Sequence, residues 1–377
     1  MNEARDIVLI SFPFAAGVAL AQFCPFPLFH PALAAVAALM LLALAGVLRG
    51  RVWYGLLFFA IGVLCGEAGS LAGGSFASLG MTGKNGMTGG NGMTGGSGMT
   101  GGNGIAAWAL ERTDTLIRGI PFPHGGTNEL LRALLTGQRD ALSQETVAAF
   151  RSAGASHILA LSGLHLGIIY LLLSKLLSLL GNGRMMAAVR SILIVAACGF
   201  YTLMTGAGPS IVRAQLFISI NELMRHSPGR RKDPLSVWCC ALILQLTVSP
   251  WVIASVGFQL SYLAMLGIFT LFPWLDAFYQ KPSRGWSPMK WMWTSMALSI
   301  SCQAFTAPLV WLRFGTFPRY FLLTNLLALP LTSLLMFSAV ACLLFTMVGC
   351  SPGWLVWTTD SLAEVLQGCL SIIASLN

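Results

Sequence analysis

Long apolar runs separated by short polar segments dominate this chain of 377 residues and restrict the folds open to it. Hydrophobic residues make up 56% of the sequence and charged residues only 9%, far below the charge content of a soluble domain. A helix needs roughly 20 mostly apolar residues to cross the bilayer core. The runs therefore predict an all-α fold, a polytopic transmembrane helical bundle of about 11 spans. The predicted spans are 7–24, 31–48, 52–72, 156–180, 187–206, 209–226, 234–249, 251–273, 292–312, 320–346 and 354–374.

The net charge of +9 fits a membrane topology without requiring nucleic acid, because Lys and Arg gather in cytoplasmic loops. Basic clusters follow the second, fourth, sixth and eighth spans, which places them on one face, whereas Arg313 and Arg319 fall on the other. The clusters are Arg49 and Arg51; Lys175, Arg184 and Arg190; Arg225, Arg230, Arg231 and Lys232; and Lys281, Arg284 and Lys290. We expect a cytoplasmic N-terminus, an external segment 73–150 and an external C-terminus. Glu3 and Asp6 offset Arg5, which favours a retained first helix over a cleaved signal peptide.

The nine cysteines lie in or beside apolar spans and act as small hydrophobes. They form no CxxC pair and no metal-like spacing with histidine. The sequence thus predicts no metal site and no cofactor.

Residues 81–104 are four copies of a hexapeptide of the type MTGGNG, which is too rich in glycine to bury a core. We expect a flexible coil there, in water rather than in hydrocarbon. Residues from Ile105 to Ile120 are typical of an interfacial helix, a second helix is expected to open at Asn128 to Arg132 and to break near Gly137, and Ser143 is a predicted N-cap for a third helix that ends near Arg151. We expect these three segments on the outer surface of the membrane. The predicted domains are transmembrane helices at 1–72, a Gly-rich repeat linker with an interfacial segment at 73–127, and a transmembrane domain at 128–377.

Polar side chains inside an apolar span are candidate functional residues, because a polar group in hydrocarbon must find a partner. In span 156–180, the candidates are His157, Ser162, Gly163 and His165. If this span is one helix, the two histidines lie two turns apart near one face. Gly163 and Gly167 form a pair of small residues that permits close helix approach. A helix-packing face with hydrogen-bonded histidines is the alternative.

Further candidates follow in later spans. Ser210 and Arg213 come directly after a Gly-Pro break at 208–209, and Gln259 and Ser261 lie in span 251–273. Arg213 could instead extend to the membrane surface, and Gln259 could simply join helices. Glu222 needs a partner from another span or a wet cavity, or pairs with Arg225 three residues on.

These residues together resemble the competence domain of the ComEC family of bacterial DNA-uptake channel proteins. The resemblance covers about residues 128–346. It rests on five segments in order: Leu134–Gly137, Ala153–His165, Ser210–Ala214, Asp233–Pro234 and Gly257–Ser261. It implies that segment 128–377 is a channel domain of the bacterial inner membrane. It also implies that this domain carries one DNA strand inward during transformation, with the eight candidates above along its polar path.

The chain departs from the family pattern in two ways. It has too few residues between the third and fourth spans for an OB-like domain, and it has no HxHxDH nuclease motif. The resemblance therefore implies separate DNA-binding, nuclease and ATPase motor proteins as partners, beside the DNA strand and the lipid bilayer. The pore could come from one chain or from a homodimer.

Two other functions stay open. One is an intramembrane serine hydrolase that uses Ser162 with His165 or His157, although such an enzyme needs an oxyanion site and residues three apart rarely share a target. The other is a transporter of small or lipid-linked molecules, which the Gly-Pro break at 208–209 permits. We expect a channel, not an enzyme.

Overall fold

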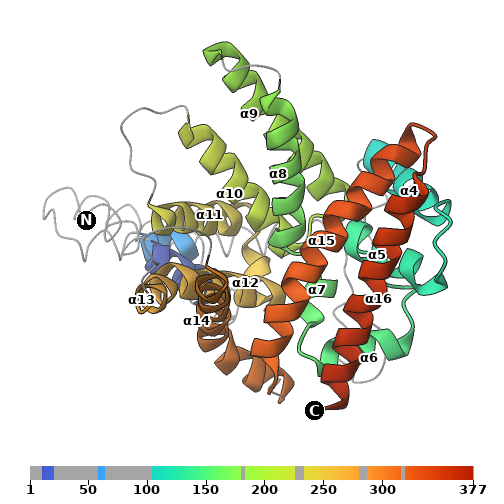
Figure 1. Cartoon of the computed structure of the whole chain (residues 1–377). Helices are drawn as coiled ribbons and strands as arrows, with labels where there is room; N and C mark the ends of the chain where they lie inside the picture. The colour runs from blue at the N-terminus through green and yellow to red at the C-terminus, as the bar shows by residue number, and fades with distance from the viewer. Residues whose placement is uncertain are drawn as a thin grey trace, which may run out of the picture. The chain divides into compact units, whose positions relative to one another are not determined.

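The computed structural model describes residues 11–20, 58–63, 104–179, 183–225, 233–279, 287–315 and 319–376, and these ranges hold helices and no strand (Figure 1). Contacts divide the chain into two units, residues 1–88 with 216–269 and residues 89–215 with 270–377. The helices are α4 (Gly104–Arg118), α5 (Gly125–Thr136), α6 (Gln144–Ser152), α7 (Ser156–Leu159), α8 (Gly163–Ser178), α9 (Arg184–Met204), α10 (Pro209–Arg225), α11 (Pro234–Val248), the 3-10 helix η1 (Pro250–Ala254), α12 (Val256–Thr270), α13 (Phe272–Ala277), α14 (Pro288–Phe314), α15 (Phe321–Met347) and α16 (Gly353–Ser375).

Four helical segments of the described ranges are long and apolar enough to cross a bilayer, which fits a membrane protein. They are Met185–Met204, Val256–Ala277, Pro288–Phe314 and Phe321–Met347, and shorter apolar helices cover Ser11–Leu20, Gly163–Ser178 and Pro234–Val248. The count of about 11 spans stays a prediction. Span 31–48 and nearly all of the hexapeptide repeat lie outside the described residues, and spans 7–24 and 52–72 lie only partly within them.

Tryptophans mark both ends of α14. Trp291 is 44% exposed and Trp311 is 66% exposed. At a rise of about 1.5 Å per residue, their separation along the helix is about 30 Å, which matches the thickness of the hydrocarbon core. Tryptophan is enriched at both membrane interfaces, so this spacing supports a membrane-spanning α14.

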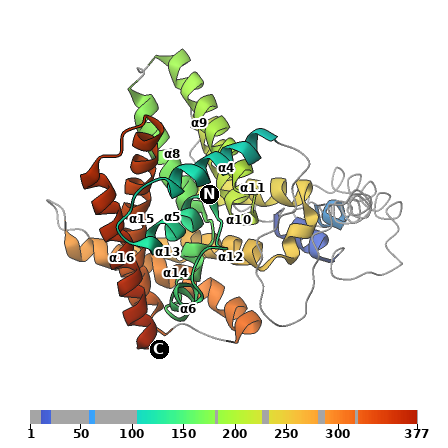
Figure 2. The same ribbon diagram turned by 90° about the vertical axis from the view of Figure 1, so that its right-hand side faces the viewer.

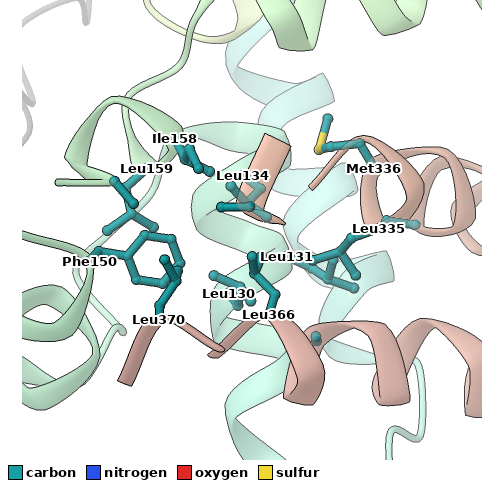
Figure 3. Close-up of a cluster of buried hydrophobic side chains, with 14 of the residues drawn as sticks. Leu130, Leu131, Leu134, Phe150, Ile158, Leu159, Leu335, Met336, Leu366 and Leu370 are labelled. Carbon is teal, nitrogen blue, oxygen red and sulfur yellow. The ribbon is translucent and has the colours of Figure 1, made fainter. Parts of the chain in front are cut away.

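The core of the second unit joins α5, α6 and α7 to α15 and α16 (Figure 3). Leu130, Leu131 and Leu134 of α5 are completely or almost completely buried there, and Phe150 of α6 lies beside Leu370 of α16. Both views place α6 near the C-terminal end of α16 (Figures 1 and 2). The sequence predicts these segments on the outer membrane surface, and the structure shows that the apolar residues of α5 pack against α15 and α16. An amphipathic helix can bury its apolar face in protein as well as in lipid.

In this unit the predicted Ser143 cap is confirmed, and the exposure of α4 fits the predicted interfacial helix. Ser143 caps α6, because its Oγ accepts a hydrogen bond from Thr146 N at 3.1 Å. In α4, Ile105 and Trp108 are exposed while Ala106 and Ile117 are buried, so this helix keeps an apolar surface as expected of an interfacial helix.

Glycine permits a close helix contact in the first unit. A Cβ at Gly17 would lie 2.1 Å from the carbonyl oxygen of Phe59, and a Cβ at Gly62 would lie 2.1 Å from that of Phe14. Only glycine fits at both positions, as in membrane helix pairs that associate through small residues. In the same unit, the phenol of Tyr262 donates to Gln245 Oε1 at 2.9 Å within an apolar cluster.

A buried carboxylate of α16 joins this helix to the start of α5 and to the residue before it. Both oxygens of Asp360 accept hydrogen bonds, Oδ1 from Thr127 Oγ1 at 2.6 Å and Oδ2 from His124 Nδ1 at 2.6 Å. The other ring nitrogen, His124 Nε2, lies 3.0 Å from Glu364 Oε1. The hydrogen bond to Asp360, helped by the charge of Glu364, raises the pKa of His124 above its usual 6.5.

A pH dependence of stability follows. Because the pKa of His124 is higher in the folded protein, its contribution is complete below the unfolded pKa of about 6.5 and is lost as the pH rises through the folded value. For the wild type in detergent, we expect the melting temperature to fall as the pH rises from about 6.5 through the folded pKa of His124. His124→Gln should flatten the profile. Equal profiles for the two proteins would contradict the protonated bridge.

Candidate functional site

The helix predicted over 156–180 is interrupted, and this interruption creates the candidate site. α7 ends at Leu159, Ala160 and Ser162 adopt extended backbone angles, and α8 begins at Gly163 (Figure 1). His157 and His165 therefore belong to different helices, and the prediction of one shared helical face is wrong. His157 is exposed at the start of α7, where its ring bonds to the backbone of Gly154.

Ser162 and His165 close the N-terminus of α8 with a capping box. Ser162 Oγ accepts from Leu164 N at 3.3 Å, and Ser162 N donates to His165 Nδ1 at 3.2 Å. Ser162 Oγ itself lies 3.1 Å from the same Nδ1. Because Nδ1 accepts from a backbone N–H, the hydrogen-bond pattern assigns the ring proton to Nε2.

The Nε2 atom of His165 is a buried donor for which the described residues provide no acceptor. The His165 residue is 0% exposed, and among the described residues no atom forms a hydrogen bond with Nε2. A buried donor left without a partner costs about 1–3 kcal/mol. An orphaned group of this kind indicates either strain or an absent ligand.

The start of α10 lies directly against the start of α8. A Cβ at Gly163 would lie 3.3 Å from Ala214 Cβ and 3.5 Å from Arg213 Nη2. Arg213 is 8% exposed, and Ser210 lies one turn earlier and is half-buried. At Gly167, by contrast, a Cβ would meet no described atom within 4 Å, so only the first glycine of the predicted pair makes the close approach.

The turn before α10 matches the predicted Gly-Pro break. α9 ends at Met204, and two consecutive residues then adopt positive φ, Gly206 at 84° and Ala207 at 49°. Alanine rarely adopts this conformation, so the turn is held by its hydrogen bonds, such as Ala207 N to Thr202 O at 2.9 Å. Pro209 then starts α10, a position where its missing N–H costs nothing.

A third segment, the loop after α5, reaches the same place. The Tyr201 phenol donates to the carbonyl of Leu135 at 2.8 Å, which ties the end of α9 to the end of α5. Gly137 follows with φ of 80°, and a Cβ there would lie 2.4 Å from Leu161 Cδ1. Arg139, two residues on, lies close enough to His165 for the two to interact electrostatically.

Arg139 was not predicted from the sequence. Its guanidinium makes no hydrogen bond or ion pair within the described ranges, and it is half-buried. Burial lowers the pKa of Arg139 below its usual 12.5. The sequence feature that could have identified Arg139 is its position two residues after Gly137, which ends an apolar helix. We call Arg139, Ser162, Gly163, His165 and Arg213 the α8 cluster; all five belong to the second unit.

The other predicted residues have separate local roles. Gln259 Nε2 donates to the carbonyl of Ile253 at 2.8 Å, which fixes η1 to α12. Ser261 is half-buried in the same helix, and both belong to the first unit. Glu222 pairs with Arg225 at 3.2 Å, as predicted. In the part of the chain that the structure describes, no three His, Cys, Asp or Glu side chains gather to hold a metal ion.

The fold and the α8 cluster define a helical membrane protein with a polar, cationic site at a helix N-terminus. The chain belongs to the Competence protein family, whose family model matches residues 134–377. That match contains every member of the α8 cluster.

Three curated relatives are similar to parts of the chain. ComE operon protein 3 of Bacillus subtilis is 32% identical over 133 residues, which cover 35% of this chain and 17% of the relative. The uncharacterized protein YcaI of Escherichia coli is 28% identical over 41% of this chain and 20% of the relative. Competence protein ComA of Neisseria gonorrhoeae is 27% identical over 45% of this chain and 25% of the relative. The matched regions thus span a quarter or less of each relative, and no solved structure matches.

The capping box predicts the effect of a substitution at Ser162. Ser162→Ala removes the acceptor for Leu164 N, and loss of such a cap costs about 1 kcal/mol. Ser162→Asp retains a capping oxygen and should lose less. The exposed Ser178, whose hydroxyl donates to the carbonyl of Lys175, is a matched control. Thermal unfolding in detergent measures the difference, and a Ser162→Ala protein as stable as Ser178→Ala would contradict the cap.

Proposed function

We propose that this chain is a channel subunit that carries single-stranded DNA across the bacterial inner membrane during natural transformation. Membership of the Competence protein family supports this function, as do the relatives ComE operon protein 3 and Competence protein ComA. The observation that carries it is the α8 cluster, in which two arginines and a histidine gather at a helix N-terminus in an apolar bundle.

The charge of the cluster suits a polyanion. Every phosphate of a DNA strand requires compensation, mainly from Lys and Arg. The N-terminus of a helix adds a partial positive charge. Arg139 and Arg213 together bring two arginines to the start of α8.

The depth of the cluster follows from the length of α8. We place the N-terminus of the chain and the basic α8–α9 connection, near Lys175, on the cytoplasmic side. The 16 residues of α8 then extend about 24 Å into a core of about 30 Å. The α8 cluster would lie toward the outer side of the membrane, where an incoming strand arrives.

In this role the chain acts with separate partner proteins and is a channel, not an enzyme. Separate DNA-binding, nuclease and ATPase motor proteins would supply the remaining steps, and one chain or a homodimer would form the pore. The proposed channel needs no cofactor. It contacts the lipid bilayer and the DNA strand.

One observation favours a second candidate, a serine hydrolase, because Ser162 Oγ lies 3.1 Å from His165 Nδ1. A catalytic base needs a partner that orients its other nitrogen, and His165 Nε2 has no such partner among the described residues. The same Nδ1 also accepts from Ser162 N, which fits a cap. A serine-reactive fluorophosphonate that labels the wild type but not Ser162→Ala would favour the hydrolase.

Proteoliposomes that contain the full chain test the channel. Labelled single-stranded DNA should enter them, and Arg213→Gln should slow entry roughly tenfold, the effect of losing one charged hydrogen bond. Arg313→Gln, which removes an exposed arginine elsewhere, is the matched control. Equal uptake by the two variants would contradict the role of Arg213. Uptake of small solutes without DNA would favour a transporter.

A further inference from the structure

Two buried or half-buried groups of the α8 cluster find no acceptor among the residues that the structure describes. Arg139 is a half-buried cation with no hydrogen bond or ion pair from the described residues. Beside it, the fully buried Nε2–H of His165 also has no acceptor there. Both groups can only donate, so neither can satisfy the other. An acceptor that carries negative charge would satisfy both.

Two other cations of the same unit have counterions. Arg132, seven residues before Arg139, has a side chain that is 12% exposed and pairs with Asp114, and its Nη2 also donates to Gln138 Oε1 at 3.0 Å. Lys290 pairs with Asp276 at 2.7 Å. The fold thus provides an acid for these cations, whereas none of the described residues provides one for Arg139.

We propose that Arg139 and His165 bind one phosphodiester group of the transported strand at the N-terminus of α8. This inference rests on the proposed function and assigns a phosphate-binding role to particular residues. The planar guanidinium of Arg139 can donate two parallel hydrogen bonds to phosphate oxygens. His165 Nε2–H supplies a third donor, and the partial charge of the helix end favours the anion.

The capping box serves this site by holding the imidazole. Ser162 N occupies Nδ1 and so keeps the proton on Nε2. A neutral donor and a permanent cation bind a singly charged phosphodiester without trapping it, as passage along a channel requires. Phospholipid head groups share this chemistry, but the fully enclosed His165 favours a ligand that enters between helices over a lipid on the outer surface.

Binding of a fluorescent oligothymidylate to the full chain tests the inference. The protein is held in nanodiscs of phosphatidylcholine, and anisotropy is measured over a salt series. Arg139→Gln should weaken binding severalfold and reduce the salt slope by about 0.7, the value for one phosphate contact on a single strand. Arg139→Lys should keep the slope and lose part of the affinity. Arg151→Gln removes an exposed arginine at the end of α6 and should change neither.

Three results would overturn the inference. The first is an equal loss of slope in Arg139→Gln and Arg151→Gln, which indicates general attraction. The second is an unchanged effect of Arg139→Gln on a methylphosphonate oligomer, which has no backbone charge. The third is loss of the Arg139 effect when phosphatidylglycerol replaces phosphatidylcholine, which assigns the site to lipid.

Transport by the wild type and by Arg139→Gln distinguishes failure of the phosphate site from failure of the proposed channel. Gel filtration and melting temperature establish that each variant is folded. If wild-type proteoliposomes admit DNA while Arg139→Gln binds and transports normally, the phosphate site is wrong and the channel stands. If the wild type admits no DNA, the channel fails.

Discussion

The Ser162–His165 capping box is the interaction on which the rest of the site depends. In apolar surroundings the free N–H groups at a helix start must find acceptors within the protein. Here the Ser162 oxygen accepts from Leu164 N and the His165 imidazole accepts from Ser162 N, so the chain can leave the helical path between Leu159 and Gly163. The interruption places a helix N-terminus inside the bundle, beside Arg213.

Much of the helical architecture was predictable, because apolar periodicity and capping residues act locally. The all-α class, the Ser143 cap, the Glu222–Arg225 pair and the turn before Pro209 all follow from neighbours in sequence. The interruption before α8 could not be predicted from neighbouring residues. The segment has no proline, and its third helical position holds His165, whereas the usual capping box has Glu or Gln there. Nor could amphipathicity tell whether α5 would face lipid or α16.

The candidate site was only partly predictable for a related reason. Ser162, Gly163, His165 and Arg213 were found because polar groups are conspicuous in apolar segments. Arg139 lies in an ordinary polar loop and becomes notable only when Tyr201 and Gly137 bring that loop to His165. The bond between His124 and Asp360 joins residues 236 positions apart, which no local pattern reveals. Gln259 and Ser261, predicted for the same path, belong to the other unit.

The contact between the starts of α8 and α10 is the most direct test of this account. A Cβ at Gly163 would lie 3.3 Å from that of Ala214, close to the separation in a disulfide. With the protein in native membranes, mild oxidation of the double variant Gly163→Cys, Ala214→Cys should yield a cross-linked peptide by mass spectrometry. The pair Gly167→Cys, Ala214→Cys should not. A cross-link from position 167 and none from 163 would mean that α8 does not begin against α10, and the site would be wrong.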